Sequence, residues 1–471
     1  MRAFAARSWP YVLYCVCAAI LVLTRQPDTD EPWDAGPAVT WLREGRPYDM
    51  AQCMWGPGFA PQLLFPGYAA LQTGWYAVFG VSILSGRTLS WLAGLLFLGL
   101  VGMLLSRLGI PSRRRSLILA LIGTAQVTLA ASDFIRPEII EMALTAGALV
   151  LLLQWIDRPT ARGPLFLAMS LIVVSMTMHL QAVFSGAAIT ALTAWIARKD
   201  ARATIAWMAP CGLLAAAVLV WWNSAFVQAS LEGYRWQLGG DMHGHVGGMA
   251  FAIARYWRGH EWIKLVVAIG LYGIPAVGLA LGAYRERTWG RRMLLAGAGA
   301  AYISCVTNLN TLDDADVVWM IPAYIASYLA TEPGSVNGSL MHRPLRVALV
   351  LVTLAMSAWG ISSTIRIGMA NPWKNLYTRD LSTFSKDFNL TESTVSGARE
   401  MMWFFDWNPS VLCAPAHGLA PMFLISKKQE TNTVPDTQMK FGHRYYLVGQ
   451  GEWFYLSRRN GTPADAIRTT P

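Results

Sequence analysis

Residues 85–106 read SGRTLSWLAGLLFLGLVGMLLS, an almost unbroken apolar run. A helix needs about 20 such residues to cross a membrane. Residues 138–156, EIIEMALTAGALVLLLQWI, form a second run of this kind. With the other runs they predict a bundle of about eleven transmembrane helices. The predicted spans lie at 8–24, 85–106, 116–132, 138–156, 163–179, 180–197, 205–222, 262–284, 293–309, 317–331 and 346–366.

The amino-acid composition also indicates a membrane protein. Of the 471 residues, 54% are hydrophobic and 14% are charged, whereas a soluble domain carries roughly a quarter charged residues. These values exclude a soluble globular enzyme. The net charge of +10 comes from bases scattered between apolar runs, and the longest basic tract is Arg113–Arg115. The excess of bases therefore does not indicate nucleic-acid binding.

Charges sort by side of the membrane if the N-terminus lies in the cytoplasm. Bases then collect in the cytoplasmic gaps, at Arg2, Arg7, Arg107, Arg113–Arg115, Arg158, Arg162, Arg198, Lys199, Arg202, Arg285, Arg287, Arg291, Arg292, Arg343 and Arg346. Acids collect outside, at Asp28, Asp30, Glu31, Asp34, Asp49, Asp133, Asp241, Asp313, Asp314 and Asp316. This partition follows the positive-inside rule and predicts a multi-pass protein of the inner or plasma membrane.

Two long exterior loops interrupt the bundle, at 25–84 and 223–261. The first holds an aromatic stretch, Phe65–Phe79, too short to span and typical of a helix lying in the membrane interface. The first apolar run could also be a signal peptide, but no small-residue cleavage site follows before Arg25, which favours a retained helix.

The composition changes after the last span. Residues 370–471 contain no run long enough to cross, and Tyr445–Val448 and Trp453–Leu456 flank a glycine-containing turn, as in a β-hairpin. We expect an all-α polytopic membrane module at 1–369 and a small mixed α/β exterior (periplasmic) domain at 370–471. Cys53 and Cys413 both fall outside and could pair.

Acids stand close to the predicted membrane surface after the first span. Asp30 and Glu31 follow it, with Asp34 one helical turn further on. A carboxylate there could accept a proton from an acceptor hydroxyl. The alternative is a solvated loop that merely follows the positive-inside rule.

A second exterior cluster lies at the start of the fourth span, where Arg136-Pro137-Glu138 is followed by Glu141. Ionisable groups at membrane depth are costly, which favours a functional role. The alternative is a pair of acids stabilised by the positive end of the helix.

Histidines mark two further places. His179 falls at the outer junction of two spans, where it is a candidate donor-binding residue; the alternative is a turn residue, as a lone histidine at such a junction often is. His243 and His245 lie on a glycine-rich loop, followed by Arg255 and Arg258 on a short helix. This loop could bind a phosphate or a divalent ion, or it is only flexible.

No cofactor is indicated with certainty. If a divalent metal binds, Asp30, Glu138 and His243 are its candidate ligands. The six cysteines have no spacing typical of a metal site.

Four motifs follow one another along the chain in a characteristic order. An Asp30-Glu31 pair, an aromatic stretch from Pro66 to Tyr76, a Phe79-Gly80-Val81-Ser82 step with Arg87, and Arg136-Pro137-Glu138 follow one another. The pattern, over roughly residues 25–160, resembles the GT-C membrane glycosyltransferases. These include protein O-mannosyltransferases, lipid A aminoarabinose transferases and rhizobial lipopolysaccharide galacturonosyltransferases.

The resemblance implies transfer of a sugar from a polyprenyl-phosphate carrier to a glycan, lipid or protein acceptor at the outer face of the membrane, with inversion. It implies Asp30 or Glu31 as the base, and Glu138 as a second acid beside Arg136. The family's base before a Leu-Pro step is missing here, where the sequence reads Asp316 to Pro322. His243, His245, Arg255 or Arg258 would then contact the carrier phosphate.

Two other classes compete. A transporter or flippase of lipid-linked sugars predicts acids in the middle of spans and related halves. Here the acids lie mainly at exterior helix ends and no internal repeat is evident, which favours the transferase. A non-catalytic scaffold displaying the C-terminal domain is the third hypothesis.

Overall fold

The structure is a computed structural model. It describes residues 2–28, 30–48, 50, 66–179, 181–198, 209, 212–213, 216, 248–308, 318–330, 342–397, 400–417, 419–427, 437–440, 443–450, 454–459 and 468–469. The chain divides into two compact units. The bundle unit comprises 1–19, 64–68 and 90–364, and the sheet unit comprises 20–63, 69–89 and 365–471.

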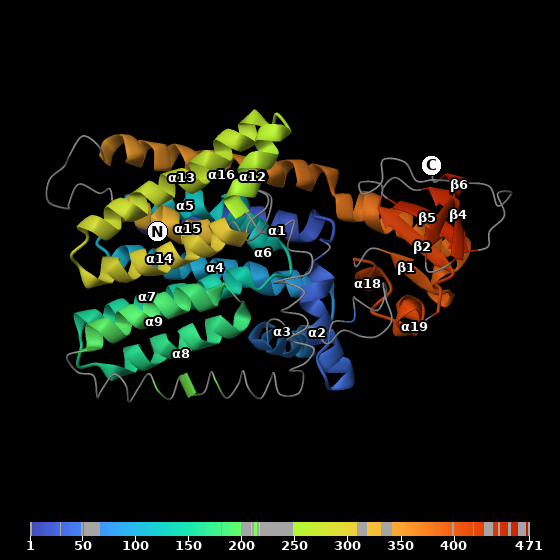
Figure 1. Ribbon diagram of the computed structural model, residues 1–471, viewed down its shortest axis with the longest axis horizontal. Coiled ribbons are helices and arrows are strands. Elements are labelled where there is room, and N and C mark those ends of the chain that lie inside the picture. Colours follow the sequence, from blue (N-terminus) through green and yellow to red (C-terminus); the bar gives the residue numbers. More distant parts are fainter. Residues whose placement is uncertain are drawn as a thin grey trace. The chain divides into compact units, whose positions relative to one another are not determined.

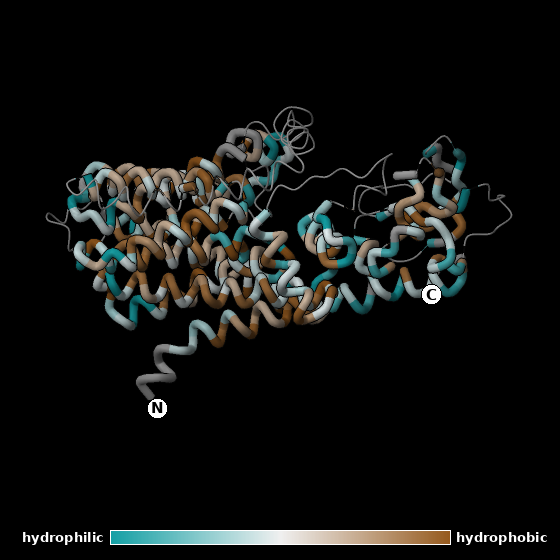
Figure 2. The backbone as a smooth tube through the Cα atoms, turned by 90° about the horizontal axis from the view of Figure 1, so that it is seen from below, coloured by the Kyte–Doolittle hydropathy of each residue, from teal (hydrophilic) through white to brown (hydrophobic). Residues whose placement is uncertain are grey.

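The bundle unit is helical, and hydrophobic residues run along its helices (Figures 1 and 2). Some helices continue into the sheet unit. The helices are α1 (Arg2–Thr24), α4 (Ile83–Arg107), α5 (Ser112–Gly123), α6 (Gln126–Asp133), α7 (Glu138–Asp157), α8 (Arg162–Met178), α9 (Ala182–Ala197), α12 (Gly248–Arg258), α13 (Trp262–Arg285), α14 (Trp289–Asn308), α15 (Met320–Ala330) and α16 (His342–Ala370).

Several of these helices can cross a membrane. Four segments of the described chain are long and apolar enough, Ile83–Arg107, Glu138–Asp157, Trp262–Tyr284 and Arg343–Phe388, and the bent pair α5–α6 makes a fifth if it is one span. The protein is therefore a multi-pass membrane protein. Every predicted run coincides with a helix or helix pair except 205–222, which lies almost wholly outside the described residues. The count of eleven spans stays a prediction.

The run predicted at 116–132 is not one straight helix. It is broken between α5 and α6, which are bent by 59°. At the break the Thr124 hydroxyl donates to the Ala120 carbonyl at 2.7 Å and lies 2.5 Å from the Ser357 hydroxyl of α16. A Cβ on Gly360 would lie 2.0 Å from the Thr124 carbonyl oxygen. Backbone therefore passes against backbone here, which requires glycine.

The sheet unit holds α2 (Glu31–Glu44), most of α3 (Pro66–Phe79) and the segments after α16. Its sheet has the strand order β1-β2-β5-β4-β3, with β6 paired to β4. The remaining elements are η6 (Trp373–Thr378), α17 (Arg379–Phe388), η7 (Leu390–Glu392), β1 (Val395–Gly397), α18 (Met401–Phe404), α19 (Pro409–Leu412), η8 (Ala414–His417), β2 (Phe423–Lys427), β3 (Thr437–Lys440), β4 (His443–Gln450), β5 (Phe454–Arg459) and β6 (Arg468–Thr469).

The predicted hairpin is confirmed. Strands β4 and β5 pair antiparallel, with Tyr446 opposite Arg458 and a register shift between Leu447 and Gly449. The small mixed sheet lies within the predicted domain at 370–471, although the boundary itself stays a prediction.

Candidate functional site

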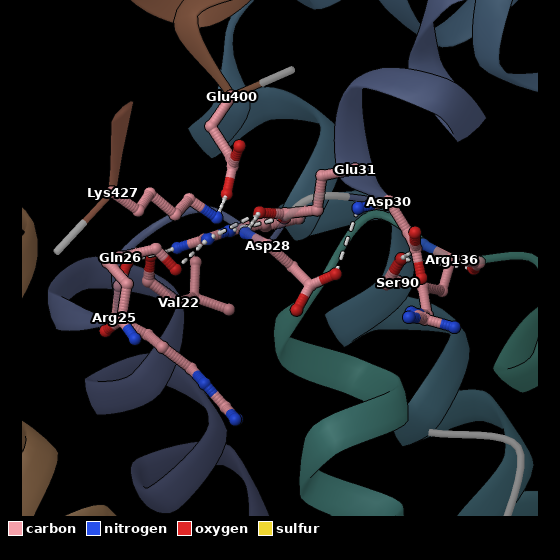
Figure 3. Close-up of polar contacts among 11 residues, drawn as sticks. Val22, Arg25, Gln26, Asp28, Asp30, Glu31, Ser90, Arg136, Glu400 and Lys427 are labelled. Atoms are coloured by element: carbon pink, nitrogen blue, oxygen red, sulfur yellow. Dashed lines mark hydrogen bonds and ion pairs between the residues drawn. The ribbon is translucent and has the colours of Figure 1, made fainter. Parts of the chain in front are cut away.

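A buried arginine organises the turn between α1 and α2. Arg87, in the first turns of α4, is 2% exposed and Glu31 is fully buried. Arg87 donates from Nε to Oε1 of Glu31 at 2.8 Å and from Nη2 to Oε2 at 2.7 Å. Its other hydrogen bonds reach the carbonyls of Val22, Arg25 and Gln26 at 3.3, 2.8 and 3.0 Å (Figure 3). We call this arrangement the Arg87 clamp.

The clamp holds the segment that carries both candidates for the general base, Asp30 and Glu31. Oε2 of Glu31 also accepts the Asp28 N–H at 2.9 Å, and Oδ1 of Asp28 accepts the Asp30 N–H at 3.0 Å. Asp30 is the N-cap residue of α2, yet its side chain makes no capping hydrogen bond. It is half-buried. Glu31 is thus fully buried in an ion pair with Arg87, whereas Asp30 is partly exposed.

Two tyrosines lie in the electrostatic range of Glu31. Burial raises the pKa of Tyr76 well above its ordinary value, and the negative charge of Glu31 raises it further. Tyr377, in the π-helical turn η6, is also buried and lies within the electrostatic reach of Glu400 and Glu31. Glu400 forms a buried ion pair with Lys427 of β2 (Figure 3). The Tyr76 phenol is therefore neutral, and its hydroxyl accepts a hydrogen bond from Gln72 Nε2 at 2.9 Å.

A second polar cluster belongs to the bundle unit. Arg136 and Glu138 lie where α6 gives way to α7, and Arg136 Nη1 is 3.3 Å from Glu138 Oε1. The Arg136 N–H donates to the Ser90 hydroxyl at 3.4 Å. His179, at the end of α8, places Nε2 4.0 Å from the same Glu138 oxygen. The structure therefore brings together three of the predicted donor-binding residues.

His179 is held in one orientation. Its Nδ1 accepts the Gln181 N–H at 3.2 Å, so in the neutral ring Nε2 carries the proton and faces Glu138. The ring stacks on Trp319 with centroids 5.9 Å apart. Trp319 is fully buried and lies in the segment where the expected base is missing.

Buried polar atoms around this cluster have no hydrogen-bond partner among the described residues. They are Glu138 Oε2, Glu141 Oε2, Gln181 Oε1 and Trp319 Nε1. Each such atom lowers the stability of the fold by about 1–3 kcal/mol unless a ligand or water supplies the missing hydrogen bond. Their concentration in one place indicates a site for a polar ligand or water.

An apolar pocket adjoins the cluster. Helices α4, α7, α9, α14 and α15 contribute to it, and its lining includes Trp319 and Thr145. The Thr145 hydroxyl donates to Glu141 Oε1 at 2.8 Å. A polar cluster at the side of an apolar pocket suits an amphiphile with a polar head and an apolar tail.

The other predicted residues are placed differently. Arg255 and Arg258 lie on α12 and are exposed. His243 and His245 lie outside the described residues, as does Cys53. Cys413 is disulfide-bonded. Within the described part of the chain, no group of three or more His, Cys, Asp or Glu side chains could hold a metal ion.

Sequence reasoning did not single out Trp319, Gln181 or Tyr377. Arg87 entered the sequence analysis only as part of the Phe79-Gly80-Val81-Ser82 motif, with no role assigned to it. The one available signal was that Arg87 interrupts an apolar run, where a charge requires a partner.

The arrangement of helices and sheet is the fold of the GT-C membrane glycosyltransferases. Two crystal structures of ArnT from Cupriavidus metallidurans have it, one bound to undecaprenyl phosphate and one in the apo state. They align with TM-scores of 0.54 and 0.56 at 12% identity, over 98% of this chain and 98% and 99% of theirs. AglB, an oligosaccharyltransferase from Archaeoglobus fulgidus, aligns over 90% of this chain and 70% of its own at 12% identity, with a TM-score of 0.49. No protein-family model and no curated protein sequence matches the chain.

Proposed function

We propose that this protein is an integral-membrane glycosyltransferase that moves a sugar from a polyprenyl-phosphate donor to a glycan, lipid or protein acceptor. The observation that carries the proposal is the buried Arg136–Glu138–His179 cluster beside an apolar pocket. The fold supports it, because ArnT, which shares that fold, was crystallised with undecaprenyl phosphate.

The cluster suits a lipid phosphate that departs from a sugar. Arg136 would neutralise charge on the phosphate oxygens, and the Nε2–H of His179 and the Trp319 N–H would donate hydrogen bonds to them. Glu138 keeps the Arg136 and His179 side chains in place, since it lies within 4.0 Å of each. Oriented donors that meet developing charge lower the barrier to bond cleavage. The apolar pocket would accept the start of the prenyl chain.

Asp30 is the general base of this proposal. The acceptor oxygen attacks the anomeric carbon, its proton passes to Asp30, and the bond to the phosphate oxygen breaks with its electron pair on the phosphate. One displacement of this kind inverts the anomeric centre. Glu31 does not serve as the base, because protonating it would break its bidentate pair with Arg87.

We place the reaction at the exterior face, with the N-terminus in the cytoplasm. Two observations support this orientation. Along the chain, loops rich in bases alternate with loops rich in acids, as the positive-inside rule requires when the N-terminus is cytoplasmic. Cys413 is disulfide-bonded, and disulfides persist in oxidising compartments. Contacts of His243, His245, Arg255 and Arg258 with the donor stay predictions, as does a divalent metal.

The test is turnover in proteoliposomes with a panel of polyprenyl-phosphate sugars and acceptors. Release of free polyprenyl phosphate reports on any donor. We expect Asp30→Asn to lose about 100-fold or more in kcat, as is typical when a general base is removed, while remaining folded. Asp34→Asn, one helical turn away, is the matched control. No turnover of the intact protein with any donor would contradict the function, and full activity of Asp30→Asn would contradict only the base.

The donor cluster has a separate readout. Arg136→Gln and His179→Ala should raise the KM for the donor more than for the acceptor, because both side chains are assigned to the phosphate. Equal effects on the two KM values would contradict that assignment.

A further inference from the structure

The bundle unit carries a second apolar groove that the proposed reaction does not use. Helices α4, α5, α15 and α16 line it, and Arg114 lies on its rim. Tyr324 donates its hydroxyl to the Leu271 carbonyl at 2.9 Å, and Thr353 donates to the Leu349 carbonyl at 2.7 Å. These hydroxyls are occupied by backbone, so the groove offers an occupant apolar walls and one cationic end.

The groove lies far from the Arg136–Glu138–His179 cluster. Ser90, which bonds Arg136, is near one end of α4, whereas Arg107 ends it. The helix rises about 26 Å between these residues. Arg114 lies at the Arg107 end, because α5 begins after a short turn. The hydrocarbon core of a bilayer is about 30 Å thick, so one lipid headgroup cannot occupy both places.

The groove has the dimensions of one leaflet. Its lining on α5 extends from Arg114 to Ile122, a rise of about 12 Å, and half of a bilayer core is about 15 Å. Arg114 is exposed, and Arg113 and Arg115 flank it in the first turn of α5. The apolar walls can bury an acyl chain, and the positive charge at the Arg114 end attracts a lipid phosphate.

We propose that this groove binds an anionic glycerophospholipid from the leaflet opposite the Arg136–Glu138–His179 cluster, with its phosphate at Arg114 and an acyl chain between α5, α15 and α16. The site is distinct from the proposed donor site and takes a lipid that is not a substrate.

Native mass spectrometry of the full chain in micelles, with added phosphatidylglycerol or phosphatidylethanolamine, tests the proposal. The intact protein should retain one phosphatidylglycerol in preference to phosphatidylethanolamine. Arg114→Gln should reduce that preference about fivefold, the effect of one basic residue near a lipid headgroup. Arg113→Gln is the matched control, because Arg113 is exposed on the same turn but does not line the groove.

A second variant keeps the charge and fills the groove. Val350→Trp should lose the retained lipid while Arg114 is intact, and its thermal unfolding should no longer respond to phosphatidylglycerol. Equal retention by Arg114→Gln and the intact protein would overturn the proposal. So would equal retention of phosphatidylethanolamine, or a displaceable mass that proves to be a polyprenyl phosphate.

Discussion

Replacing Arg87 with methionine should destabilise the turn between α1 and α2. The structure indicates how large the loss in the free energy of unfolding should be. Methionine keeps an unbranched apolar side chain, although a shorter one, and leaves the fully buried Glu31 carboxylate without its partner. Removing one member of a buried ion pair typically costs about 3–5 kcal/mol. The carbonyls of Val22 and Gln26 lose their donor in the same step.

The double variant Arg87→Met/Glu31→Leu separates these contributions. It removes both charges, so the uncompensated carboxylate disappears, and only the carbonyls and the Asp28 N–H lose a hydrogen-bond partner. We expect it to be more stable than Arg87→Met, because apolar replacement of a whole buried pair is often neutral. A coupling free energy of about 2 kcal/mol or more should result.

Unfolding in mixed SDS micelles, followed by tryptophan fluorescence, measures these differences. Arg107→Met is the control, since Arg107 lies on the same helix and pairs with Asp157 at 3.6 Å in a partly exposed position. An exposed pair contributes less than about 1 kcal/mol. If Arg87→Met were no more destabilised than Arg107→Met, the clamp would not hold the turn together.

Three further predictions use other sites. Gly360→Ala should destabilise the protein by about 1–3 kcal/mol through its clash with Thr124, whereas Gly99→Ala, which meets nothing within 4 Å, should not; equal melting temperatures of the two variants would contradict this. The contribution of Tyr76 to the free energy of unfolding should be constant below pH 10 and fall above it, because the unfolded chain releases the phenolic proton near 10.0 while burial keeps it in the folded protein. The stability of Tyr76→Phe should therefore fall less steeply in alkaline melts than that of the intact protein. Cys413→Ser should lower the free energy of unfolding by about 2–4 kcal/mol, and a reductant should lower the stability of the intact protein but not of the variant.

The helices were largely predictable, because apolar runs of spanning length leave few alternatives in a membrane. The interfacial stretch Phe65–Phe79 corresponds to α3, and the strand pattern of residues 445–456 corresponds to β4 and β5. Each of these signals is local. The bend between α5 and α6 was not predictable, because no proline marks it and the backbone that packs against it, at Gly360, is more than 200 residues away in the chain.

The candidate site was predictable only in part, for the same reason. Arg136-Pro137-Glu138 is a contiguous motif, and the cost of burying its acid favoured a functional role over helix capping, which stays a prediction. The choice between Asp30 and Glu31 depends on Arg87, which is 56 residues from Glu31 in the chain. Trp319 was missed because a tryptophan in an apolar run looks like any core residue until His179 stacks on it.

The Arg87 clamp also imposes an order on biosynthesis. Glu31 is made before Arg87, and at a translation rate of about 5–20 residues per second the interval is roughly 3–11 s. During that interval Arg87 is absent, so its bidentate pair with Glu31 cannot form and α2 cannot take its buried position. The beginning of α4 must therefore emerge before the segment that carries Asp30 acquires its final shape.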